Sequence, residues 1–248
     1  MAGNLGKSSF SALSAELSWN NQCQLQVASA TADLSVQETY PWITSYPKIR
    51  NILKEFKFNK GRITMEALHL TGSLLKPEKW QYETSGSMQN LAINWRPFPG
   101  TLFIENGKFK GVPTTLTLTD TQGSMLDGSF KADAELNEFR KGLLGANLRI
   151  GGTLGPESIQ WLAGLGNLPP ELYFQPPLRV VGGRLVWERN STIAFAGKLM
   201  PKGGPQVTVN QTWRKGNLCI KELLIQDEQS NASISLDIMP EALEVKYP

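Results

Sequence analysis

Alternation of apolar and polar residues recurs throughout this chain, and it constrains the fold more than any other feature. It is clearest in residues 60–77, where Ile63 and Met65 alternate with polar neighbours. Leu68 and Leu70 continue the alternation after a phase slip of one residue. A period of two predicts a β-strand with one apolar and one polar face, and the slip predicts a β-bulge.

The same period of two marks many further segments, most of them separated by short stretches that carry Gly, Asn or Asp. This spacing is typical of antiparallel strands joined by tight turns. We therefore expect one apolar face on each strand, and we take these faces as the candidate ligand-binding surface. The residues expected to line it are Ile63, Met65, Leu68, Leu70, Leu91, Ile93, Leu116, Leu118, Leu185, Trp187, Ile193, Phe195, Val207, Val209, Ile234 and Leu236.

Two segments break this rhythm and predict short helices. In residues 47–57, Ile49, Leu53 and Phe56 recur with the spacing of one helical face, and the proline at the start suits a first helical turn. The second helix is predicted for residues 156–168, which also begin with a proline and end before a proline pair.

Strands and helices together predict a mainly β protein. We expect an elongated, curved antiparallel sheet that forms a hydrophobic groove, with two short helices. A closed sandwich, in which two apolar faces bury each other, accounts for the alternation equally well. The alternation alone does not distinguish the open groove from the closed sandwich.

A weak internal repeat indicates two modules. Gly61–Arg62–Ile63 and Gly183–Arg184–Leu185 each follow a predicted helix and open a strand. Repetition favours units that pack on their neighbours. We expect a first β-groove module over residues 1–150 and a second, similar and truncated module over residues 151–248, each with one helix. We also expect the chain to be an internal segment of a longer protein.

Two dipeptides indicate tight turns between strands. Asn106–Gly107 and Asp127–Gly128 both belong to the residue pairs that two-residue hairpin loops favour. We expect the chain to reverse direction at both points.

Charge and motif content argue against several classes of function. The formal net charge is only +3, and Lys and Arg are scattered along the chain, so nucleic-acid binding is not expected. The sequence contains none of the common nucleophile, metal or nucleotide motifs. His69, the one histidine, is expected at the surface, and Cys23 and Cys219 are expected to be buried free thiols, with a disulfide as the alternative. We therefore expect a non-enzymatic protein without a cofactor or metal.

Several long segments resemble the AsmA-like superfamily, the TamB- and YhdP-like bridge-like lipid transfer proteins of Gram-negative bacteria. The resemblance lies in a loose order of Gly, Leu and Trp among short strands, and it covers most of the chain. The segments that carry it are PKIRNILKEF, GRITMEALHLTGSLLKPEKWQYETSG, LAINWRPFPGTLFIENGKFKG, LPPELYFQPPLRVVGGRLVWE and VTVNQTWRKGNLCIKELLIQD.

This resemblance implies a periplasmic β-sheet bridge whose hydrophobic groove guides phospholipid between the inner and outer membranes. Such proteins are anchored to the inner membrane by an N-terminal helix, and this chain contains no run of about 18 apolar residues. The implied partners are phospholipid or another acyl-chain lipid, neighbouring segments of the same longer protein and envelope membrane proteins, with no nucleic acid. The family has no catalytic residues to carry over. The alternative is a structural or adhesive β-domain with a closed core and no lipid ligand.

Overall fold

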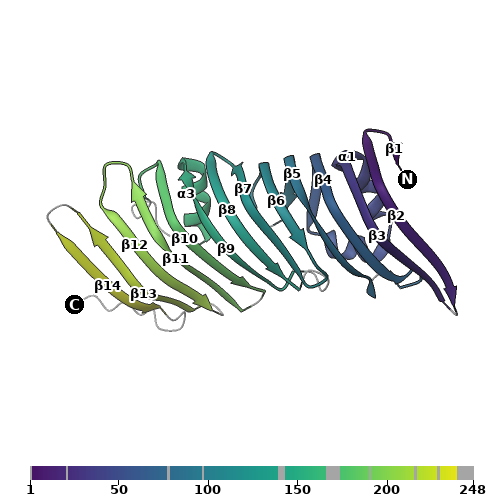
Figure 1. The fold of residues 1–248 in the computed structure, drawn as a ribbon. Helices are drawn as coiled ribbons and strands as arrows, with labels where there is room; N and C mark the ends of the chain where they lie inside the picture. Colours follow the sequence, from purple (N-terminus) through teal and green to yellow (C-terminus); the bar gives the residue numbers. More distant parts are fainter. Residues whose placement is uncertain are drawn as a thin grey trace. The chain divides into compact units, whose positions relative to one another are not determined.

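The computed structural model describes residues 2–20, 22–76, 79–96, 98–138, 143–165, 174–189, 191–214, 217–227 and 230–238. These residues form fourteen strands and three helices (Figure 1). The chain divides into two compact units, of which the first comprises Met1–Leu126 and Asp133–Leu144 and the second Asp127–Ala132 and Gly145–Pro248. We describe each unit separately.

The first unit is an open antiparallel sheet in which each strand is hydrogen-bonded to the next along the sequence. Two helices interrupt the strands between β3 and β4. The elements are β1 (Gly3–Leu5), β2 (Ser8–Asn20), β3 (Gln22–Ser35), α1 (Val36–Thr44), α2 (Pro47–Leu53), β4 (Phe56–Ser73), β5 (Gln81–Trp95), β6 (Thr101–Gly111) and β7 (Thr115–Met125). Strand β8 (Gly128–Asn137) is shared between the units: its first residues, up to Ala132, belong to the second unit and the rest to the first.

The second unit repeats this plan with one helix. Strands β9 to β14 pair antiparallel in sequence order, and α3 lies between β9 and β10 in the chain. The elements are β9 (Gly145–Leu154), α3 (Pro156–Leu165), β10 (Leu178–Glu188), β11 (Thr192–Pro201), β12 (Gln206–Arg214), β13 (Asn217–Gln226) and β14 (Asn231–Ile238). The predicted mainly β, antiparallel fold is confirmed.

Bulges keep the apolar residues of the long strands on one side. In β4 the register shifts between Met65 and Ala67, which confirms the bulge predicted from the phase slip. In β5, Asn90 adopts a positive φ of 51°, and the apolar positions change from even numbers before it to odd numbers after it. A bulge adds one residue to a strand, so the side chains on either side of it stay on the same face.

Gly61 lies inside β4 at a further bulge rather than in a turn that opens the strand. Its φ is +126°, a conformation that L side chains rarely adopt. A Cβ at this position would lie 2.4 Å from Cδ2 and 2.6 Å from Cα of Leu91. Glycine is therefore required here for both the backbone conformation and the close approach of β5.

The helix prediction is confirmed at two places and incomplete at a third. Helices α2 and α3 occupy the predicted segments; α2 ends at Leu53, α3 is described up to Leu165, and residues 166–168 lie outside the described part of the chain. Helix α1 was not predicted, because Val36 continues the alternation of the preceding strand and Pro41 interrupts the helix interior. Tertiary packing of the helix against the sheet overrides this unfavourable local sequence.

Of the two predicted turns, one is confirmed and one is wrong. The chain reverses between β7 and β8 at Leu126 and Asp127, immediately before Gly128. By contrast, Asn106 and Gly107 lie within β6. A Cβ on Gly107 would lie 3.0 Å from Oγ1 of Thr121 and 3.2 Å from Cε of Met88, so this glycine serves close packing instead of a turn.

Candidate functional site

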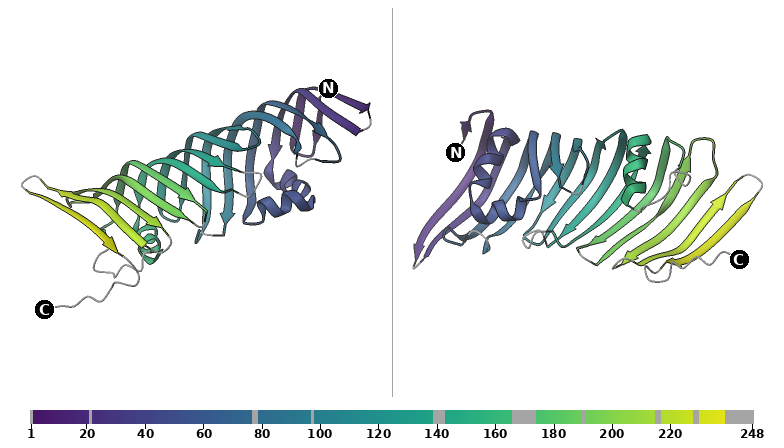
Figure 2. Two further views of the ribbon diagram at one scale, coloured as in Figure 1. Left: turned by 90° about the horizontal axis from the view of Figure 1, so that it is seen from below. Right: turned by 180° about the vertical axis from the view of Figure 1, so that it is seen from behind.

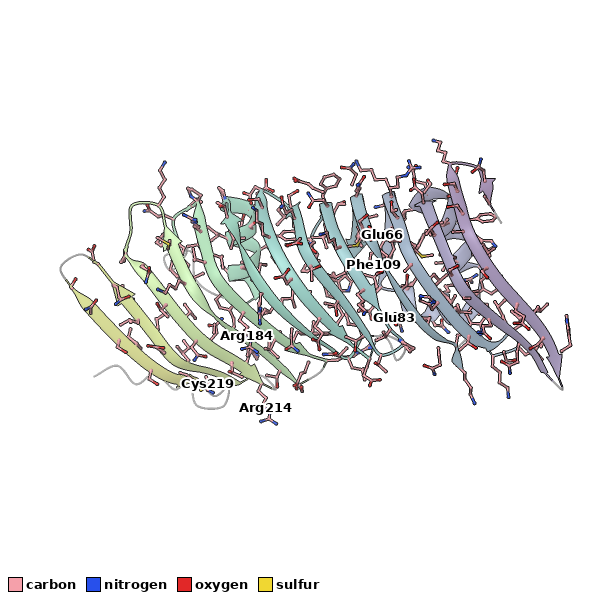
Figure 3. The ribbon with its side chains drawn as sticks, in the orientation of Figure 1. Glu66, Glu83, Phe109, Arg184, Arg214 and Cys219 are labelled. Atoms are coloured by element: carbon pink, nitrogen blue, oxygen red, sulfur yellow. The ribbon has the colours of Figure 1, made fainter. Side chains whose placement is uncertain are left out.

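The apolar residues of β4 to β7 share one face of the first unit's sheet, because residues directly opposite one another in an antiparallel pair point to the same side. Ile63 of β4 lies opposite Met88 of β5. Phe109 of β6, labelled in Figure 3, lies opposite Leu118 of β7. The register places on this face all eight residues predicted in the unit, which are Ile63, Met65, Leu68, Leu70, Leu91, Ile93, Leu116 and Leu118.

The opposite face of the first unit is polar and carries cross-strand charge pairs. Lys110 Nζ lies 2.8 Å from Oε1 of Glu83, and both side chains are more than half exposed. The hydrogen bond from Lys110, followed by its positive charge, lowers the pKa of the Glu83 carboxyl. His69 lies opposite Glu83 on the neighbouring strand and is exposed. Exposed pairs of this kind contribute little to stability, and they mark the solvent side of the sheet.

Helices α1 and α2 cover part of the apolar face of the first unit (Figure 2). Val36 of α1 packs with residues of β5 and β6 in a buried cluster comprising Val36, Met88, Leu91, Ile93 and Ile104. Leu91, at 1% exposed, is the most deeply buried of the residues expected to line the binding surface. Ile93 is also buried here, so these two positions lie in a closed core.

Tyr40 fixes α1 to the start of β4. Its hydroxyl donates a hydrogen bond of 2.6 Å to the backbone carbonyl of Phe56, and its ring centroid lies 5.4 Å from that of Phe58. Burial raises the pKa of this phenol. On the same helix, the carboxylate of Glu38 accepts hydrogen bonds from the backbone N–H of Lys7 and the hydroxyl of Ser8. The helix is therefore held by polar contacts as well as by apolar packing.

Beyond this helix-covered core, the apolar face of the first unit contacts solvent. Phe10, Leu17 and Trp19 of β2 are 39%, 45% and 74% exposed. Register places them with Ala32, Leu25 and Cys23 of β3, which continue the face from β4. The sequence contained a signal for these positions, since Ala15, Leu17 and Trp19 alternate, but they were not included among the residues expected to line the surface.

The second unit has a comparable apolar face. Ile193 of β11 lies between Trp187 of β10 and Trp213 of β12. Leu223 of β13 lies opposite Ile234 of β14. The register places on this face the backbone positions of all eight residues predicted in the unit, which are Leu185, Trp187, Ile193, Phe195, Val207, Val209, Ile234 and Leu236; the Leu236 side chain lies outside the described residues.

Large side chains on the second unit's apolar face are substantially exposed. Ile193 is 48% exposed, Ile234 45% and Trp213 39%. Val207 and Val209, by contrast, are buried. Trp213 was not included among the predicted surface residues, although the strand 206–214 alternates up to it. The apolar face is therefore accessible along much of this unit.

Helix α3 is held at its N-terminus by a carboxylate from the turn before β8. Asp127 accepts hydrogen bonds from the backbone N–H groups of Glu157, at 2.8 Å, and Ser158, at 3.0 Å, and from the Ser158 hydroxyl, at 2.7 Å. Desolvation, the largest single influence, raises the pKa of Asp127, but these hydrogen bonds together outweigh it and the pKa is lowered. Ile159 and Ala163, which belong to the helix itself, are buried.

Two surface depressions of the first unit lie away from the predicted residues. One lies beside α1 and is lined in part by Tyr40 and Phe58, and the other lies at the end of β5 and is lined in part by Trp95 and Phe98. Neither includes a residue expected to line the binding surface. The candidate site is therefore an apolar sheet face in each unit rather than an enclosed pocket.

The described residues contain no group of three or more His, Cys, Asp or Glu side chains arranged to hold a metal ion. Cys23 and Cys219, expected to be buried, are partly exposed, and they are not joined in a disulfide. In the part of the chain that the structure describes, none of the helices has the length and apolarity needed to cross a membrane. No protein-family model, curated protein or solved structure matches this chain.

Proposed function

We propose that the apolar sheet faces of this chain bind the acyl chains of phospholipid, and that the chain is a non-enzymatic segment of a longer, periplasmic, bridge-like protein of the AsmA-like type. The observation that carries the proposal is the exposure of large apolar side chains on a face that is apolar across successive strands. In the second unit, Ile193, Trp213 and Ile234 are between 39% and 48% exposed on that face.

An acyl chain fits such a surface because it needs continuous apolar contact and no directional partner. Transfer of each methylene from water contributes about 0.8 kcal/mol, so a dozen methylenes contribute roughly 10 kcal/mol before the costs of association. Monomeric proteins rarely leave large contiguous apolar patches in water unless another molecule covers them. A ligand that spreads over many side chains also requires no single essential residue.

The alternative function, a structural β-domain with a closed core, is favoured by one observation in the first unit. Helix α1 covers the cluster around Leu91, which is only 1% exposed. Leu118 packs against this cluster, so a charge at Leu118 would test core stability together with lipid binding. A clean test of lipid binding must therefore use exposed positions such as Ile193 and Ile234.

The proposal is tested by extracting the purified chain with organic solvent and identifying the extract by mass spectrometry. We expect phospholipid from the wild type, and at least a fivefold lower yield from an Ile193→Asp, Ile234→Asp double variant that keeps its circular dichroism spectrum. The matched control is Lys198→Asp, on the polar face of β11, which should retain the wild-type yield. A folded wild type that yields no lipid, and takes none up from vesicles, would favour the closed structural domain.

A further inference from the structure

At one end of the first unit's strands, the apolar face reaches two neighbouring turns that project exposed side chains. We call Trp19, Leu74, Leu75, Lys76 and Lys79 the tip patch. Trp19 is 74% exposed at the end of β2, and Leu75, at 77% exposed, follows the end of β4. Leu74 is 41% exposed. Figure 1 shows these strand ends at the lower edge of the first unit.

The two turns are joined through Cys23. Cys23 lies opposite Trp19 in the β2–β3 pairing, and its carbonyl accepts a hydrogen bond of 3.0 Å from the backbone N–H of Leu74. Trp19 and Leu74 therefore lie on strand ends that flank the same residue. This contact makes the tip patch one surface rather than two unrelated exposed side chains.

Local contacts hold residues 73–76, at the end of β4 and directly after it, in a defined conformation. Trp80 lies over Gly72, where a Cβ would come within 2.3 Å of its ring, and its indole N–H donates to the carbonyl of Ser73 at 2.7 Å. The same carbonyl accepts from the N–H of Lys76 at 3.0 Å. The hydroxyl of Ser73 accepts from the N–H of Leu75 at 3.3 Å. Because the N–H groups of Leu74, Leu75 and Lys76 all have acceptors, the two leucines project without leaving these donors unpaired.

The charge that the sequence places beside these apolar side chains is net positive, since residues 74–79 contain two lysines and one glutamate, Glu78. Lys76 and Lys79 are both exposed, and within the described part of the chain neither forms an ion pair. The adjacent strand end, residues 17–25, contains no charged residue. An exposed Trp and two leucines beside two exposed lysines form a surface that is complementary to a layer with an apolar interior and an anionic boundary.

We propose that the tip patch docks the protein onto the surface of a bilayer that contains anionic phospholipid, with Trp19, Leu74 and Leu75 inserted at the level of the headgroups. Tryptophan is favoured at membrane interfaces because its ring is amphipathic, and lysine keeps its ammonium at the headgroups while its stem lies along apolar material. Basic side chains near an anionic leaflet add electrostatic attraction. The occupant is a bilayer surface, which is different from the single acyl chains proposed for the sheet faces.

Vesicle flotation tests this proposal on the full chain. We expect the protein to float with vesicles of phosphatidylcholine and phosphatidylglycerol, and to bind at least about tenfold less to phosphatidylcholine alone. Trp19→Ser combined with Leu75→Ser should lower binding to the mixed vesicles about tenfold or more, since two inserted apolar side chains are lost. Lys76→Glu combined with Lys79→Glu should lower binding similarly and remove most of its salt dependence.

Matched variants separate the tip patch from general surface properties. Trp42→Ser removes another tryptophan, 62% exposed on α1, and Lys198→Glu with Lys202→Glu makes the same change in net charge in the second unit. Both controls should float as the wild type does. Ile193→Asp should also float normally while yielding less extracted lipid, so failure of one proposal is distinguishable from failure of the other.

Three outcomes would overturn the docking proposal. One is a wild type that stays at the bottom of the gradient with anionic vesicles at low salt. Another is equal loss of flotation in the tip-patch variants and their controls. The third is a tip-patch variant that floats normally but loses self-association or binding to a protein, which would identify the surface as a protein interface.

Discussion

The two units of this chain carry the same kind of apolar face, but they differ in how far a helix covers it. In the first unit, α1 lies over the face and buries Leu91 to 1% exposure in a closed cluster. In the second unit, Ile193 and Ile234 remain 48% and 45% exposed. Ile159 and Ala163 of α3 are buried, whereas Ile193 of β11 and Ile234 of β14 stay exposed.

The difference shows that alternation determines which side of a strand is apolar, while the connecting segments determine whether that side meets water. In the first unit the connection after β3 forms two helices, and the polar contacts of Glu38 and Tyr40 hold α1 in place. A face covered in this way stabilises the fold, whereas an uncovered face is available to a ligand. The two units therefore combine a stabilising core with a candidate binding surface.

Introducing a carboxylate on each apolar face should give the largest difference in stability between the two units. We expect Leu91→Asp to destabilise the first unit by about 4 kcal/mol or more, because it places an unpaired carboxylate in the helix-covered core. Ile193→Asp should cost only about 1 kcal/mol, since the carboxylate at this half-exposed position stays hydrated. Chemical denaturation followed by circular dichroism measures both. Equal destabilisation by the two variants would show that the second face is also covered.

Two glycines with positive φ provide a smaller, purely steric comparison. Gly61→Ala should destabilise the first unit by about 3 kcal/mol for two reasons. The new Cβ would clash with the backbone of Leu91, and the alanine would have to adopt a positive φ that is unfavourable for an L residue. Gly182 has a φ of +60°, and a Cβ at this position would have no other atom within 4 Å. Gly182→Ala should therefore lower the free energy of unfolding by only about 1 kcal/mol. Thermal denaturation of both variants measures the difference. If Gly182→Ala destabilises the protein as much as Gly61→Ala does, the space around residue 182 of β10 is not open.

The helices should differ in their response to acid. The pKa of Asp127 is lowered in the folded protein, so its contribution is complete above its ordinary pKa, about 3.8, and is lost as the pH falls through the lowered folded value. Asp127→Asn should therefore loosen α3 by about 1 kcal/mol at neutral pH, with a smaller difference from wild type at pH 2 to 3. Tyr40→Phe should loosen α1 by about 1 kcal/mol without this acid dependence.

Hydrogen exchange of peptides from α1 and α3, measured at neutral and acidic pH, follows each helix separately. The Asp127→Asn variant should exchange faster in α3 at pH 7 and leave α1 unchanged. A difference in α3 between the variant and wild type that grows as the pH falls would contradict the assigned role of the Asp127 carboxylate.

Much of the sheet could be predicted from the sequence because side-chain alternation is a local property of a strand. The bulge after Met65 was visible as a phase slip, and the register places the predicted residues of each unit on one face. The missed helix α1 shows the limit of local signals. Val36 continues a strand-like alternation, and only contacts with β5 and β6, distant in sequence, favour the helix at that position.

Exposure at the candidate site could not be predicted for the same reason. Leu91 and Ile193 have similar alternating surroundings in the sequence, yet one lies beneath a helix and the other meets solvent. The Asn106–Gly107 pair was misinterpreted because its glycine is needed for close packing against Thr121 and Met88 on the neighbouring strands, not for a turn. Both cases depend on which strands come together, information that a local pattern does not contain.

Site-specific photocrosslinking tests the central claim, that acyl chains occupy the exposed apolar face, most directly. A photoreactive residue at Ile193 or Phe195, on the apolar face of β11, should form adducts with phospholipid when the protein is expressed in bacteria and irradiated. The same residue at Lys198, on the polar face of the same strand, should form few or none. Lipid adducts of equal yield at Ile193 and Lys198, or none at either apolar position in a folded protein, would contradict the account.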